Sequence, residues 1–196
     1  MKAKTMDIIL AGVGGQGSLL AGRVLGDVFA AEGYDVKISE VHGMAQRGGS
    51  VVTYVRAGGS VASPIVGEGC ADIFIAFEEL EALRYLPYLK KGGRIVFNTQ
   101  KIAPMPVITG AAKYPAAIID EIKNAGVDFA YADALALARE AGSIKCANVV
   151  MLGLAAASMD IPKERFIDAV GRLVPQKFVD VNLKAFESGY ALAADA

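Results

Sequence analysis

The feature that most constrains the fold of this chain is the run Gly12-Val13-Gly14-Gly15-Gln16-Gly17, which fits the pattern G-x-G-x-x-G. An apolar run over residues 6–11 precedes it, and Leu20, Val24 and Val28 follow it at helical spacing. Glycines at such a junction allow a tight turn, and the unsatisfied N–H groups at the start of a helix favour an anion. The run therefore predicts a strand, a glycine turn suited to phosphate, and a helix.

Two further segments set the expected order of the sheet. Residues 34–40 alternate apolar and polar side chains and predict a second strand, which completes a β-α-β unit with a right-handed crossover and a parallel pair. Residues 50–56 and 60–66, joined by Ala57-Gly58-Gly59, have the β-branched content and glycine turn of a hairpin. We therefore expect a mostly parallel sheet that becomes mixed through one hairpin.

The rest of the chain continues the alternation of strands and helices. Strands are expected over 72–77, 94–98 and 127–131, and helices over 79–85, 116–124, 133–139 (with Asp133 as N-cap), 148–158, 163–173 and 183–192. Residues 99–117 contain Pro104, Pro106 and Pro115 without a clear period, and predict a long connection that carries function. The pattern predicts one α/β domain over residues 1–196, a three-layer α/β/α Rossmann-like fold.

Charge and cysteine content argue against several classes of function. Lys plus Arg total 20 and Asp plus Glu total 21, so no net field favours nucleic acid or an anionic membrane. Cys70 and Cys146 lie far apart and form no C-x-x-C pair, which argues against a disulfide scaffold, a zinc site or an iron–sulfur cluster. No apolar stretch reaches the roughly 18 residues of a membrane span, so we expect an unprocessed, cytoplasmic protein.

The glycine run has two interpretations. In the first it binds NAD or FAD, with Glu40, about 20 residues further on, as the ribose-binding carboxylate. In the second the glycines serve only the tight turn and the close approach of the helix to the sheet. A self-sufficient dehydrogenase also needs a proton donor and a substrate domain, yet His42 is the single histidine and little length remains. This makes the dehydrogenase less favoured and leaves it open.

A second glycine-bearing segment, Glu40-Val41-His42-Gly43-Met44-Ala45-Gln46-Arg47-Gly48-Gly49-Ser50, follows the second expected strand. In an open α/β sheet, ligands and partners sit at this end of the strands. Arg47 offers a planar fork of donors to a carboxylate or phosphate, while Gly48 and Gly49 let another backbone come close. In the alternative, Arg47 and Glu40 tie the segment to its own domain.

Two side chains in the middle of this segment carry separate expectations. His42 has no second histidine and no acidic or thiol neighbour at ligand spacing, so we interpret it as a hydrogen-bonding loop residue rather than a metal ligand. Met44 between glycines exposes apolar surface unless a helix of the same domain or another chain covers it.

The two glycine-bearing segments together resemble the gamma-type domain of the 2-oxoacid:ferredoxin oxidoreductases, most closely the beta subunit of the indolepyruvate enzymes. The resemblance runs from about residue 6 to about residue 190. It continues in Ser63-Pro64, Gly69-Cys70-Ala71-Asp72, Phe77-Glu78-Glu79-Leu80-Glu81-Ala82, Tyr114-Pro115, Asn148 and Asn182 with Ala185-Phe186. The His-Gly-Met-Ala-Gln form before Arg-Gly-Gly favours the aryl-pyruvate branch.

The resemblance implies a reaction in which a 2-oxo acid, coenzyme A and oxidised ferredoxin give an acyl-coenzyme A, carbon dioxide and reduced ferredoxin. It also implies a large alpha subunit that carries thiamine diphosphate, magnesium and iron–sulfur clusters. This chain lacks a Gly-Asp-Gly segment with a downstream Asn-Asn, and it lacks the cysteines for a cluster. We therefore expect no cofactor on this chain alone.

The expected role of the chain is to supply surface that completes the active site of the large subunit. Ferredoxin is expected to interact through the complex, and an isolated chain is expected to form a homodimer. No residue is expected to be catalytic. The residues expected to line the ligand or partner site are Gly12, Gly14, Gly15, Gln16, Gly17, Glu40, His42, Met44, Gln46, Arg47, Gly48 and Gly49.

Overall fold

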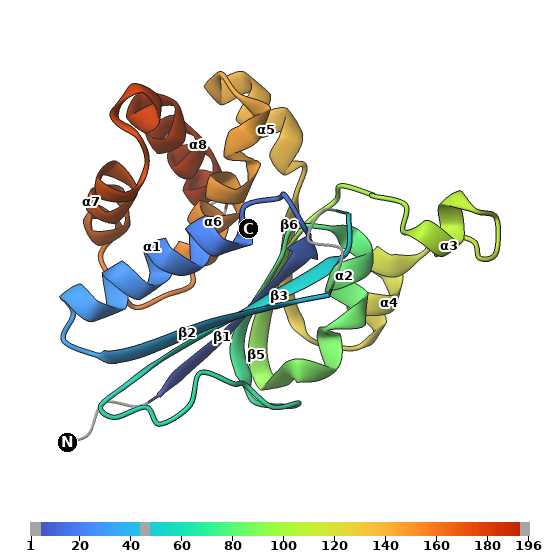
Figure 1. The fold of residues 1–196 in the computed structure, drawn as a ribbon, viewed down its shortest axis with the longest axis horizontal. Helices are drawn as coiled ribbons and strands as arrows, with labels where there is room; N and C mark the ends of the chain where they lie inside the picture. Colours follow the sequence, from blue (N-terminus) through green and yellow to red (C-terminus); the bar gives the residue numbers. More distant parts are fainter. Residues whose placement is uncertain (1–4, 44–47, 193–196) are drawn as a thin grey trace.

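The computed structural model describes residues 5–43 and 48–192, and its centre is a six-stranded mixed sheet of order β2-β3-β1-β4-β5-β6 (Figure 1). The parallel pairs are β1–β4, β4–β5 and β5–β6, whereas β3 runs antiparallel to both β1 and β2. The strands are β1 (Met6–Val13), β2 (Asp35–His42), β3 (Ser50–Gly58), β4 (Ala71–Ala76), β5 (Leu89–Asn98) and β6 (Asp128–Ala132). The predicted mixed, mostly parallel sheet is confirmed.

The predicted parallel pair of β1 and β2 is wrong, because β3 lies between them. Val55 of β3 faces Ile8 of β1 on one side and Ile38 of β2 on the other. Val55 is fully buried, while β2 is half-buried or exposed along its length. A strand rich in buried valines suits the interior of a sheet, and the alternating, charged β2 suits the edge.

The predicted hairpin over residues 50–66 is also wrong in its second half. Only the first half forms a strand, β3, and residues 59–70, all of them described, contain no strand. Arg56 instead donates to the carbonyl oxygens of Ser63 and Ile65, each at 3.2 Å, and the Val61 N–H donates to Asp35 at 2.8 Å. Side chains therefore hold this segment, and the hairpin of the sheet is β2–β3.

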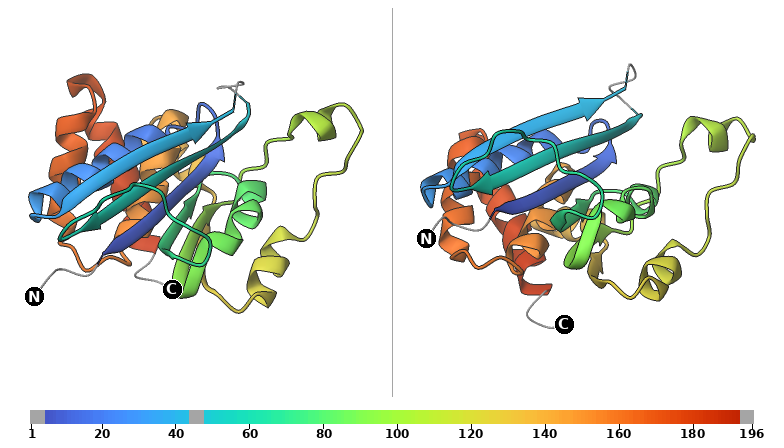
Figure 2. Two further views of the ribbon diagram at one scale, coloured as in Figure 1. Left: turned by 60° about the horizontal axis from the view of Figure 1, so that its bottom comes forward. Right: turned by 90° about the horizontal axis from the view of Figure 1, so that it is seen from below.

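Helices cover both faces of the sheet, which gives the predicted three layers (Figures 1 and 2). One face carries α1 and α5–α8, and the other carries α2 and α4. The helices are α1 (Ser18–Ala31), α2 (Glu79–Arg84), α3 (Met105–Ile108), α4 (Ile118–Asn124), α5 (Ala134–Ala141), α6 (Ala147–Ala156), α7 (Lys163–Leu173) and α8 (Val179–Leu192). The α7 prediction is confirmed at both ends, and α8 begins about one turn earlier than predicted.

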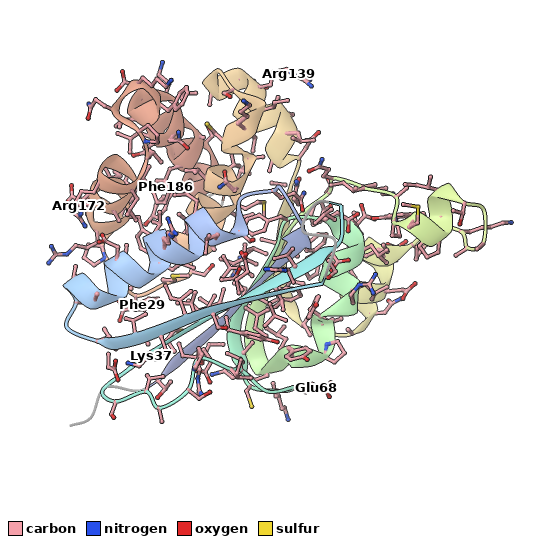
Figure 3. The ribbon with its side chains drawn as sticks, in the orientation of Figure 1. Phe29, Lys37, Glu68, Arg139, Arg172 and Phe186 are labelled. Carbon is pink, nitrogen blue, oxygen red and sulfur yellow. The ribbon has the colours of Figure 1, made fainter. Side chains whose placement is uncertain are left out.

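Helices α6 and α8 pack with almost no space between their backbones. A Cβ atom built on Gly153 of α6 would lie 2.1 Å from the Phe186 carbonyl oxygen, and one on Gly189 of α8 would lie 1.9 Å from the Val150 carbonyl oxygen. Both glycines are therefore required by close approach of the helices rather than by a turn. Figure 3 shows Phe186 inside this helical layer, whereas Arg139 points outward from α5.

Residues 99–117 form an arm that leaves the end of β5, carries the short helix α3 and returns to α4 (Figures 1 and 2). The sequence predicted a long connection here. Met105 and Ile108 on α3 are each 67% exposed, so the arm does not fold back to bury its apolar side chains. After β6, Asp133 caps α5 by accepting the Ala136 N–H at 3.0 Å, as predicted.

Candidate functional site

The glycine turn after β1 and the segment before β3 lie together at one rim of the sheet. The Gly14 N–H donates to the Gly49 carbonyl oxygen at 2.8 Å, and the Gly48 N–H donates to the Gly14 carbonyl oxygen at 3.3 Å. These bonds continue the antiparallel β1–β3 pairing beyond Val13 and Ser50. The rim is therefore built from main chain, as the abundance of glycine at both places predicts.

Gln16 holds the glycine turn in shape with its side-chain amide. Its Oε1 accepts the Val13 N–H at 2.7 Å, and its Nε2 donates to the Phe77 carbonyl oxygen at 2.8 Å and to Gln100 Oε1 at 2.9 Å. The side chain thus links the carboxyl ends of β1, β4 and β5. Both polar atoms of the Gln16 side chain form hydrogen bonds within this chain. Gln16 therefore fixes the conformation of the glycine turn.

Gly17 is the N-cap residue of α1 and has a left-handed conformation, with φ of 83°. Asn148 Nδ2 donates to the Gly17 carbonyl oxygen at 3.1 Å, and a Cβ on Gly17 would lie 2.5 Å from that nitrogen. Sequence reasoning assigned Asn148 no role at the site. The available signal was a polar residue at the start of the otherwise apolar helix α6, which is unfavourable unless its amide has a partner.

Glu40 connects the end of β2 to the start of α1. One carboxylate oxygen of Glu40 accepts from the hydroxyls of Ser18 and Thr53, each at 3.3 Å. The Thr53 side chain is fully buried in the sheet. These contacts favour the interpretation in which Glu40 ties the segment to its own domain.

A cavity of about 350 Å³ opens beside the glycine turn. Glycine backbone, the Ser18 hydroxyl and apolar Leu19 and Val51 form much of its wall, and Glu40 and His42 are the described lining residues with acid or base side chains. His42 is the last residue of β2 rather than a loop residue as predicted, and its Nδ1 lies 3.0 Å from the Gly43 carbonyl oxygen. Such a wall can bind and orient a polar ligand, and its Ser18 hydroxyl is directed to the Glu40 carboxylate.

A second cavity, of about 220 Å³, lies across Gly15 from the first. The amide side chains of Gln16, Asn98, Gln100 and Asn148 line it together with Lys145. Asn98 Nδ2 donates to the Phe77 carbonyl oxygen at 3.1 Å, and Asn98 Oδ1 accepts the Ala134 N–H at 3.1 Å. The amides therefore join the ends of β4, β5 and β6 into one rigid rim.

The predicted site residues fall into two groups. The structure brings together Gly12, Gly14, Gly15, Gln16, Gly17, Glu40, His42, Gly48 and Gly49 at this rim. The predictions for Met44, Gln46 and Arg47 fall on residues 44–47, which lie outside the described residues.

Metal and thiol chemistry find no support in the described part of the chain. Its His, Cys, Asp and Glu side chains form no group of three or more that could hold a metal ion. Cys70 is exposed, whereas Cys146 is buried, and burial raises the pKa of the Cys146 thiol. Between residues 5 and 192, leaving out 44–47, no helix is long and apolar enough to cross a membrane.

Comparisons with known proteins match almost the whole chain. The model of the family "Pyruvate ferredoxin/flavodoxin oxidoreductase" matches residues 7–192. Subunit IorB of indolepyruvate oxidoreductase from Thermococcus kodakarensis is 43% identical over 199 residues, which cover 98% of both chains. The subunit of the same name from Pyrococcus horikoshii has the same identity and coverage. The gamma subunit of a keto/oxoacid ferredoxin oxidoreductase from Geobacter sulfurreducens is 25% identical, with a TM-score of 0.72 over 97% of this chain and 99% of that one.

These similarities do not support the dinucleotide-binding alternative, and the rim supplies a physical reason. A dinucleotide binds in the crevice at the strand ends where successive helices pass to opposite faces of the sheet. Here α1 and α2 do so, and the crevice lies between β1 and β4. The Gln16 side chain spans it and donates to the Phe77 carbonyl oxygen on the far side.

Proposed function

Because the chain belongs to the pyruvate ferredoxin/flavodoxin oxidoreductase family, we propose that it is the small subunit of a 2-oxoacid:ferredoxin oxidoreductase that acts on indolepyruvate or another aryl pyruvate. The name of the IorB relatives, at 43% identity over nearly their full length, supports the indolepyruvate branch. The His-Gly-Met-Ala-Gln form of residues 42–46 supports the same branch.

One observation carries the proposal: the two glycine-bearing segments are joined by main-chain hydrogen bonds into a single rim beside an open cavity. A rim of this kind lets another polypeptide or a ligand approach the backbone closely. In the proposed complex it meets the large subunit at its active site, where it excludes water and orients the 2-oxo acid or coenzyme A. This chain contributes binding surface and no catalytic group.

The cofactors of the reaction belong, in this proposal, to the large subunit. The described residues of this chain do not fit an iron–sulfur cluster. Of their two cysteines one is exposed and the other is buried, and the described residues contain no group of three possible ligands. Thiamine diphosphate, magnesium and the clusters are assigned to the large subunit, and coenzyme A is the co-substrate.

The proposed reaction converts a 2-oxo acid and coenzyme A into an acyl-coenzyme A and carbon dioxide. The two electrons released in this oxidation pass to ferredoxin through the large subunit. The proposal includes a single domain over residues 1–196, a cytoplasmic location and a homodimer for the isolated chain.

The direct test is reconstitution. The chain alone, supplied with indolepyruvate, coenzyme A and ferredoxin or a viologen dye, is expected to give no dye reduction. The chain together with a large subunit that carries the thiamine and cluster motifs is expected to restore turnover. Oxidation of indolepyruvate by the isolated chain would contradict the proposed division of labour.

A further inference from the structure

The N-cap and first turn of α2 carry three buried carboxylates that the proposed function does not use. Glu78, Glu79 and Glu81 are 1%, 2% and 4% exposed. Burying a carboxylate is costly unless it is paired or hydrogen-bonded, so each should have a specific partner. Glu79 pairs with Lys101 at 3.5 Å, and Glu81 pairs with Arg84 at 3.0 Å and accepts from Ser50.

Glu78 differs from its neighbours because hydrogen bonds, and no ion pair among the described residues, satisfy its carboxylate. Its Oε1 accepts the Ile102 N–H at 2.9 Å and the Tyr114 hydroxyl at 2.6 Å. Its Oε2 accepts the Glu81 N–H at 3.0 Å and so caps α2. Burial and the bond to Glu78 raise the pKa of Tyr114, so its hydroxyl stays protonated and remains a donor.

The two long-range partners of Glu78 stand at opposite ends of the arm. Ile102 lies near its start and Tyr114 near its end, so one carboxylate oxygen joins the two ends. Between them α3 extends from the body of the protein (Figure 2). The remainder of the arm is therefore held at its base.

The arm forms one wall of an apolar groove of about 420 Å³. Met105 and Ile108 line that wall, and Gly48, Gly49 and Ser50 line the opposite one. Glu81 holds Ser50 on that opposite side. Two carboxylates at the N-terminus of α2, Glu78 and Glu81, thus hold the two walls of the groove. The groove adjoins the rim described above.

We propose that Glu78 is a positioning residue that fixes both ends of the arm over residues 99–117 and so holds the outer wall of the groove in place against Gly48–Ser50. The proposal rests on the proposed function in one respect, namely that the groove belongs to the surface that meets the large subunit. Glu78 touches no reacting atom and acts through the arm.

The first test compares Glu78→Gln with Asp7→Asn in the full chain. The glutamine has one acceptor oxygen instead of two, so it cannot satisfy all three donors. Asp7 is a matched control, because its carboxylate is also mostly buried and bonded, to Arg56 at 2.8 Å, at the opposite end of β1. Trypsin is the probe, since Lys101 and Lys113 directly precede Ile102 and Tyr114.

Cleavage after Lys101 and Lys113 is expected to become about tenfold faster in Glu78→Gln and to stay at the wild-type rate in Asp7→Asn. Tyr114→Phe removes one donor and leaves the carboxylate, so it is expected to give a smaller acceleration, and it serves if Glu78→Gln does not fold. Wild-type cleavage rates in Glu78→Gln, or in Tyr114→Phe where that variant stands in, would overturn the assigned role.

The second test uses the enzyme assembled with the large subunit. Glu78→Gln is expected to raise the concentration of small subunit needed for half-maximal turnover about tenfold, while kcat at saturation changes less than about twofold. Wild-type half-saturation together with faster trypsin cleavage would make Glu78 merely structural. Failure of the wild-type chain to restore turnover would reject the proposed function instead. The trypsin result would still decide whether Glu78 fixes the two ends of the arm.

Discussion

Glycine serves opposite purposes in two regions of this molecule. In the helical layer, Gly153 and Gly189 remove side chains so that the backbones of α6 and α8 can touch. At the rim, Gly14, Gly48 and Gly49 leave the main chain accessible and joined by hydrogen bonds. The first arrangement fills space and contributes stability, whereas the second leaves a cavity open beside it. Substitutions in the two regions should therefore separate folding from activity.

The largest effect is expected in the helical layer, from Gly189→Ala. The new Cβ would stand 1.9 Å from the Val150 carbonyl oxygen, so α6 and α8 must move apart. We expect the free energy of unfolding to fall by about 3 kcal/mol, measured by urea denaturation. Gly171→Ala in α7 is the control, because its Cβ meets nothing within 4 Å, and it should stabilise by about 0.5–1 kcal/mol. Equal effects of the two variants would break the comparison.

The next largest effect is expected at Gln16, which we expect to affect both folding stability and activity. Gln16→Ala removes the side-chain acceptor of the Val13 N–H and one of the two side-chain donors to the Phe77 carbonyl oxygen, the other being Asn98. We expect a loss of about 2 kcal/mol in unfolding free energy and a drop in assembled-enzyme turnover of about tenfold or more. Unfolding curves and turnover should be measured on the same preparation. Loss of stability with wild-type turnover would show that the glycine turn does not shape the site.

A smaller effect, confined to activity, is expected from Arg47→Ala. The sequence prediction gives this guanidinium a carboxylate or phosphate to bind, so assembled-enzyme turnover should fall about tenfold while the unfolding midpoint stays near wild type. Arg47→Lys keeps the charge, lacks the planar fork and should recover only part of the activity. Wild-type turnover of Arg47→Ala would return Arg47 to the interpretation in which it only ties the segment to its own domain.

The smallest effect is expected from Asp35, at the end of β2 away from the rim. The hydrogen bond from Lys37, followed by the one from the Val61 N–H, lowers the pKa of Asp35. A lowered folded-state pKa gives stability that is present above the ordinary pKa near 3.8 and is lost as pH falls through the folded-state value. In Asp35→Asn, the free energy of unfolding should fall slightly less steeply as the pH is lowered, and turnover should stay unchanged. A change in turnover would contradict the assignment of activity to the rim.

Local patterns in the sequence predicted most helices and strands. The features that the sequence did not predict depend on contacts between residues far apart in the chain. Pro162 before an amphipathic run fixed the limits of α7, and the glycine turn marked the junction of β1 and α1. The neighbours of β2 depend on β3, which pairs on both sides, and no pattern within β2 reveals that choice.

At the candidate site, too, local features were predicted from the sequence and long-range contacts were not. The sequence identified both glycine-bearing segments and the end of the sheet where they lie. It did not predict the amide network, because Gln16 bonds to Phe77 and Gln100, which are 61 and 84 residues away. The partners of Glu78, 24 and 36 residues away, could not be read from the sequence for the same reason.

The central claim, that the rim is the surface that meets the large subunit, can be tested by hydrogen–deuterium exchange of the chain with and without that subunit. Protection on binding is expected in peptides that cover residues 12–18 and 40–51, and none is expected in α7 over Lys163–Leu173. Protection of α7 and α8 with unchanged exchange at both glycine-bearing segments would contradict the account.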